Sequence, residues 1–165
     1  MPTEPPALTR SDAWLLAAVT ERSRNGRPIR LRDLVHDADW LDRAIPTFDE
    51  LSYGLPRLIQ AGYVTVETGP RDGLLFRATA QATEVRRSLK PRRLGDVVIG
   101  FEREVGTVAY AGKEPPEDRS LGRLPGLKPD DLDAAVKEHA AWVARWSWPL
   151  VIVARALTRW QNRGR

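Results

Sequence analysis

Residues capable of acid–base or metal chemistry are few in this chain. It contains no cysteine and only two histidines, which excludes thiol catalysis and cysteine-based zinc sites. His36 is followed by Asp37 and Asp39, but adjacent residues on a helix do not face one another, so this group predicts no metal site. His139 lies on an apolar stripe, which favours a hydrogen-bonded core or interface histidine over a catalytic base.

Phosphate-binding and nucleophile motifs are also absent. Residues 106–113, GTVAYAGK, are similar to a phosphate loop but have one residue too many between the glycines and no Ser or Thr after Lys113. The chain contains no Gly-x-Gly-x-x-Gly segment and no nucleophile elbow. We therefore expect a non-enzymatic protein that uses no cofactor and no metal, so its function should lie in a binding surface.

The stretch from Thr47 to Thr83 predicts the elements that would present such a surface. Thr47 and Glu50 have the spacing of a capping box at a helix start, and Gly62 can end that helix in the left-handed conformation. Apolar residues follow at helical spacing between these points: Leu51, Leu55, Leu58 and Ile59. Two alternating segments, 63–68 and 74–78, flank a turn-forming segment and predict a β-hairpin.

This pattern resembles a known superfamily. The sequence LPRLIQAGYV, then a hairpin, then LFRATAQATEVRR resembles the end of the recognition helix and the wing of MarR- and PadR-like winged-helix regulators. The resemblance covers roughly residues 8–90 and implies a homodimer formed by the terminal helices. We predict an α+β, mainly helical fold: a winged helix-turn-helix with a C-terminal helical extension.

The segments before this stretch fit the same fold. Ser11 or Asp12 can cap a first helix that stops at Asn25 and Gly26, and residues 28–31 suit a short first strand. A second helix should follow. The connection to Thr47 is several residues longer than the tight turn of the family, and we expect its apolar members to pack against the core: Trp40, Leu41 and Ile45.

The remaining chain, residues 91–165, forms the predicted extension. The apolar residues of segment 94–108 suit one face of a helix, although its valines and glycines are also compatible with a strand. Residues 111–128 are rich in Pro and Gly and predict an exposed loop. Pro129 or Asp130 should open a long apolar-striped helix, which Pro149 should interrupt before a shorter helix begins.

DNA binding is the first functional hypothesis, and local charge supports it only in part. Phosphate neutralisation by cations dominates DNA affinity, yet six acidic residues outnumber four arginines between residues 28 and 62, in a chain of net charge +4. Asp49 would face phosphate with the wrong sign, and no nearby cation offsets it. Pro56 should also kink the recognition helix. The candidate DNA-binding residues are Ser52, Tyr53, Arg57, Arg71, Arg86 and Arg87.

Protein binding is the second hypothesis. Four of the six tryptophans lie in the last 24 residues, where they could pack on the winged domain, form a homodimer seam, or contact a membrane surface. The segment is short for a membrane-surface helix, so we disfavour that contact. The candidate protein-interaction residues are Phe48, Asp49, Trp142, Trp146 and Trp160.

These observations predict a cytoplasmic, homodimeric protein. Its charge-free runs of nine residues are too short to span a bilayer, and its first residues lack the order of a secretion signal. The expected partner is double-stranded DNA, for a transcriptional regulator, or an unidentified protein that binds the acidic helix-turn-helix face. The fold favours DNA, whereas the local charge favours a protein.

Overall fold

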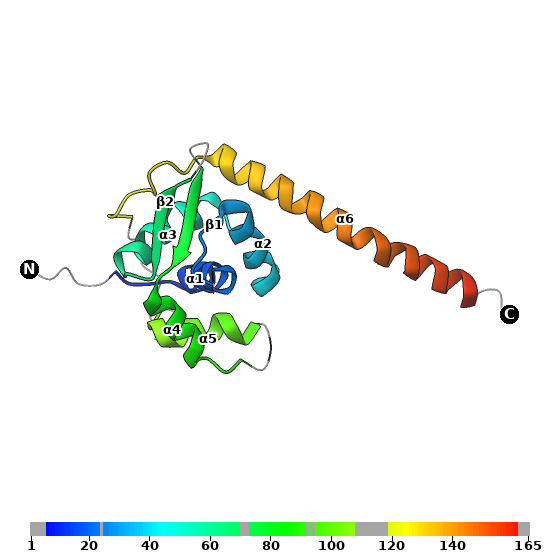
Figure 1. Ribbon diagram of the computed structural model, residues 1–165, viewed down its shortest axis with the longest axis horizontal. Coiled ribbons are helices and arrows are strands. Elements are labelled where there is room, and N and C mark those ends of the chain that lie inside the picture. Colours follow the sequence, from blue (N-terminus) through cyan, green and yellow to red (C-terminus); the bar gives the residue numbers. More distant parts are fainter. Residues whose placement is uncertain are drawn as a thin grey trace, which may run out of the picture.

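The computed structural model describes residues 6–23, 25–69, 73–91, 93, 95–107 and 119–161, with side chains of the last helix described as far as Trp146. In these ranges six helices accompany one three-stranded antiparallel sheet, so the α+β, mainly helical class is confirmed (Figure 1). The elements are α1 (Arg10–Arg22), β1 (Ile29–Arg30), α2 (Leu31–Asp42), α3 (Phe48–Gln60), β2 (Val64–Thr68), β3 (Leu74–Ala78), α4 (Ala80–Ser88), α5 (Gly95–Val105) and α6 (Pro129–Gln161).

The core forms around α1, whose residues are buried continuously from Asp12 to Thr20. Such burial on all sides is expected of a helix at the centre of a domain, and α1 packs against α2, α3 and α5. The predicted caps of α1, Ser11 or Asp12, are wrong by two or three residues. Thr9 is the cap, because its hydroxyl accepts the Asp12 N–H at 3.2 Å while the Asp12 carboxylate accepts the Thr9 N–H at 2.8 Å.

The α3 helix and the hairpin agree with the sequence prediction. The Thr47 N–H donates to the Glu50 carboxylate at 2.8 Å, and the Glu50 N–H donates to the Thr47 hydroxyl at 3.2 Å, which completes the capping box. Gly62 follows α3 with a φ of +79°. The sheet order is β1-β3-β2, so the short first strand pairs with the far strand of the hairpin.

The segment between α2 and α3 differs from the prediction. Leu41 is buried as expected, but Trp40 is 65% exposed and Ile45 is 43% exposed. The reason is that α2 continues to Asp42. Its helical spacing turns Ala38 and Leu41 toward the core, which leaves the intervening Trp40 on the outer face.

The chain after α4 contributes to the same core. Residues 95–105 resolve the helix-or-strand alternative as helix α5, and Val98 and Phe101 join the core around α1. The loop predicted at residues 111–128 is described from residue 119 onward. Leu124 and Leu127 are buried there, so the expectation of a wholly exposed loop is wrong.

The last helix, α6, extends well beyond the globular body (Figure 1). We predicted that Pro149 would end one helix and begin another, but α6 runs from Pro129 to Gln161 without interruption. A proline removes one backbone hydrogen bond, and the turns on either side of Pro149 keep their helical backbone. Across the described residues, no helix has the length and apolar content required to cross a bilayer.

A buried ion pair joins α1 to α3. The Arg57 guanidinium donates from Nε and Nη2 to the two carboxylate oxygens of Asp12, each at 2.8 Å. Gly54 lies one turn earlier on α3, directly against this pair. A Cβ built at Gly54 would lie 2.7 Å from Asp12 Oδ1 and 3.0 Å from Leu15 Cδ1, so only glycine lets the two helices approach this closely.

We therefore expect Gly54→Ala to destabilise the fold by about 1–3 kcal/mol, the usual cost of overpacking a core. The matched control is Gly95→Ala at the start of α5, where an added Cβ meets no atom within 4 Å. Urea unfolding of both variants measures the difference. Equal free energies of unfolding for the parent and Gly54→Ala would contradict the close approach described here.

Candidate functional site

Residues 119–127, which we call the strap, pack over the outer side of α3. Pro56 has no N–H, so the Ser52 carbonyl four residues earlier receives no hydrogen bond from within the helix. The Leu124 N–H of the strap donates to that carbonyl at 2.8 Å. Leu124 and Leu127 are both buried. The strap thus supplies the hydrogen bond that Pro56 removes.

Two arginines of the strap lie on the first turns of α3. The Cζ of Arg119 lies 4.7 Å from the Tyr53 ring centroid, and the Arg119 guanidinium lies 3.5 Å from the Asp49 carboxylate. Arg123 donates from Nε to the Tyr53 hydroxyl oxygen at 3.0 Å, and its Cζ lies 5.6 Å from the Phe48 ring centroid. The expectation that no cation offsets Asp49 is therefore wrong.

Three of the predicted DNA-binding residues are engaged inside the domain. Ser52 is fully buried, and its hydroxyl donates to a backbone carbonyl of its own helix. Arg57 holds the buried Asp12, and Arg86 pairs with Glu21 in a mostly buried contact. A groove or phosphate contact by Ser52, Arg57 or Arg86 would therefore require these groups to leave their partners inside the domain.

The remaining candidate residues of the winged region lie in different surroundings. Arg87 is 73% exposed and pairs with Glu84 one turn earlier on α4. Tyr53 is partly covered by the strap. Asp49 stays exposed beside the two strap arginines. Arg71, another candidate DNA-binding residue, lies outside the described residues.

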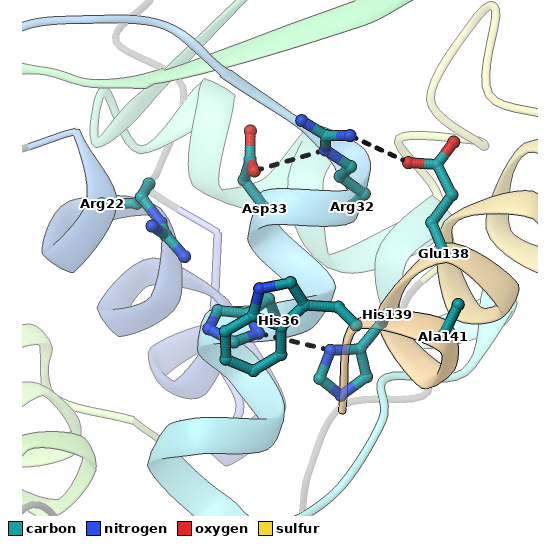
Figure 2. Close-up of a pocket in the computed structure, with 8 residues that line it drawn as sticks. Arg22, Arg32, Asp33, His36, Glu138, His139 and Ala141 are labelled. Atoms are coloured by element: carbon teal, nitrogen blue, oxygen red, sulfur yellow. Dashed lines mark hydrogen bonds and ion pairs between the residues drawn. The ribbon is translucent and has the colours of Figure 1, made fainter. Parts of the chain in front are cut away.

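A second group of polar and aromatic side chains joins α2 to α6 (Figure 2). His36 and His139 approach through their Nδ1 atoms at 3.3 Å, and His139 Nε2 lies 2.9 Å from the Asp39 carboxylate. The Trp142 ring meets the His36 ring edge-on, with centroids 4.3 Å apart. His139 is thus a hydrogen-bonded interface histidine, as the apolar stripe predicted.

The protonation of this pair follows from its geometry. An ionised carboxylate only accepts hydrogen bonds, so His139 carries a proton on Nε2 toward Asp39. The contact between the two Nδ1 atoms then needs one proton between the rings. Burial lowers the pKa of His36, which favours the neutral form of this ring in the folded protein.

A pocket of about 600 Å³ opens beside the two histidines. Its walls come from α1, α2 and α6: Arg22, Arg32, Asp33, His36, Glu138, His139, Ala141 and Trp142. Arg32 pairs with Glu138 at 3.1 Å, and Arg22 forms two hydrogen bonds with Asp37. The pocket therefore offers hydrogen-bonding groups whose charges are already balanced. Among the described side chains, no three His, Asp or Glu converge on a metal position.

Large apolar side chains are exposed next to this junction. Trp40 and Trp142 border a second pocket, of about 420 Å³, that α1, α2 and α6 line together. Val143, the next residue of α6, is 40% exposed, and Trp146, one turn beyond Trp142, is 62% exposed. We call these four residues the aromatic surface. Trp142 and Trp146 were predicted to contact a protein, whereas the side chain of Trp160 lies outside the described part of the chain.

Sequence reasoning missed two sets of residues. Arg119 and Arg123 lie in a segment without periodicity, and only the aromatic and acidic residues at the start of α3 could have suggested an arginine partner. His36 and His139 are 103 residues apart, and no local pattern links them. Trp40 was predicted to be buried, so its place in the aromatic surface was also missed.

The chain has no match among protein-family models, curated proteins or solved structures. The geometry of its own side chains therefore carries the functional inference.

Acidification should loosen the junction between α2 and α6. The pKa of His36 is lower in the folded protein than its ordinary value of about 6.5, so the unfolded chain takes up this proton more readily. The contribution of His36 to the free energy of unfolding is complete above that ordinary value, and it is lost as the pH falls from there toward the lower pKa of the folded protein. Urea unfolding between pH 8 and pH 6 should show this loss in the parent and a flatter profile in His36→Gln. Parallel profiles would contradict the assignment.

Proposed function

We propose that this chain is a non-enzymatic protein-interaction module built on a winged helix, and that α6 pairs with the α6 of a second copy. The order helix, strand, helix, helix, hairpin supports the winged-helix framework. The aromatic surface carries the proposal, because monomeric proteins seldom leave several neighbouring large apolar side chains in water. The engaged state of Ser52 and Arg57 weighs against α3 as a DNA-reading helix.

The spacing of α6 supports a helical partner. Its seam positions alternate steps of four and three residues, which is the spacing of a coiled coil: Leu132, Val136, His139, Val143 and Trp146. The first three are covered by the body of the protein, whereas Val143 and Trp146 are exposed. The same spacing continues in the sequence at residues 150, 153, 157 and 160. The body of the protein therefore covers only the first part of the seam, and the seam positions continue along α6 beyond it.

Charge favours a second copy in antiparallel orientation. Residues 147–165 contain four arginines and no acid, whereas α2 carries four aspartates and one arginine. An antiparallel pair would bring the basic end of each α6 toward the acidic α2 of the other copy. A helix of this length spans about 50 Å, so the end of α6 can reach past its own body.

If the seam forms the dimer, Val143→Ser with Trp146→Ser should give a folded monomer, because both side chains are exposed in the single chain. Arg145→Ser, in the same turn but off the seam, is the matched control and should remain dimeric. Light scattering gives the mass, and a thermal melt checks the fold. A parent chain that is monomeric at high concentration would rule out the pairing.

DNA binding is a second candidate, supported by the element order and by the exposed Arg87 at the end of α4. The DNA phosphates would then contact cationic side chains that remain exposed on the surface, such as Arg87, rather than Arg57. A homodimer would place two winged domains in one particle, as proteins that read paired half-sites do. This role keeps the transcriptional-regulator hypothesis open beside the protein-interaction one.

If the chain binds DNA, Arg87→Ala should weaken the affinity equally for all duplex sequences. The slope of log affinity against log salt concentration should fall by about one. Glu84→Ala should act in the opposite direction, since it removes the carboxylate that pairs with Arg87. An electrophoretic titration at several salt concentrations measures both effects. Identical affinities of parent and both variants would count against a phosphate contact at the end of α4.

A further inference from the structure

The start of α3 carries a surface made for a planar cation. Phe48, Asp49 and Tyr53 lie on its first two turns, and the two strap arginines rest against them. We propose that this surface is an arginine-binding site occupied by the strap as a built-in ligand, and that an arginine-rich segment of another protein binds there by displacing Arg119 and Arg123. This site is separate from the seam of α6.

The side chains of α3, and not its backbone, attract the guanidinium groups of the two strap arginines. A helix N-terminus carries partial positive charge and disfavours cations, yet two guanidinium groups lie beside this one. The ring faces of Tyr53 and Phe48 attract a guanidinium through their π electrons. The Asp49 carboxylate supplies the opposite charge, and the Tyr53 hydroxyl accepts a hydrogen bond. Arginine satisfies all three kinds of contact, whereas lysine lacks the planar group that stacks on a ring.

The strap arginines can be exchanged without unfolding the strap. The side chains of Arg119 and Arg123 remain 62% and 59% exposed, and exposed ion pairs contribute little to stability. The strap itself is held independently by buried Leu124 and Leu127 and by the hydrogen bond to the Ser52 carbonyl. A competing peptide therefore has to move only two flexible side chains.

A labelled octa-arginine peptide, titrated by fluorescence anisotropy, tests the proposal. Arg119→Ala with Arg123→Ala should bind it about tenfold more tightly than the parent, because the intramolecular competitor is gone. Asp49→Asn with Tyr53→Leu should lose most of the binding. The matched control is Asp130→Asn, an exposed acid at the start of α6, which should leave the affinity unchanged.

Octa-lysine, with the same charge, should bind the arginine-depleted variant at least several-fold more weakly than octa-arginine. The proposal is overturned if removing the strap arginines leaves affinity for octa-arginine unchanged, or if the two peptides bind equally. Because both strap arginines are exposed, that variant keeps its fold, and circular dichroism verifies it. The result thus stays decisive even if the variant at Tyr53 fails to fold.

Discussion

The ion pair between Asp12 and Arg57 sets the geometry on which the rest of the molecule depends. The same Asp12 carboxylate caps α1 and holds Arg57 of α3, so helix initiation and helix packing share one buried charge. Loss of either partner would leave an uncompensated buried ion, which costs about 3–5 kcal/mol. Gly54 brings the helices close enough for this pair to form. The pair thereby fixes the rotation of α3 about its axis and turns Asp49 and Tyr53 outward.

That rotation explains why the strap lies where it does. The carbonyl of Ser52, which Pro56 leaves without its helical partner, receives the N–H of Leu124 from the strap. The proline that removes one backbone hydrogen bond from α3 therefore creates the attachment point for a covering segment. Once attached, the strap places two arginines beside Asp49, so an acidic helix start becomes a surface on which cation and carboxylate are balanced.

Local signals in the sequence were sufficient for much of the fold. The capping box at Thr47, the left-handed Gly62 and the hairpin each depend on residues within a few positions of one another. The contacts that shape the candidate sites join residues far apart in the chain, such as Arg57 with a carboxylate 45 residues away and His139 with a ring 103 residues away. The charge of Arg57 and the periodicity around His139 could not by themselves identify those distant partners. The predicted break at Pro149 was wrong for a related reason. The loss of one backbone hydrogen bond costs less than the helical turns on either side contribute to the stability of α6.

His139 determines where α6 stops being part of the body and becomes an exposed helix. It occupies a seam position of α6, and a polar residue at such a position fixes register because only one alignment satisfies it. Here that alignment offers the Asp39 carboxylate and the His36 ring. Sliding α6 by one turn along α2 would break both of these hydrogen bonds, which is costly in a packed interface. The histidine therefore fixes α6 in one register, and the exposed seam begins at Val143, one turn beyond it.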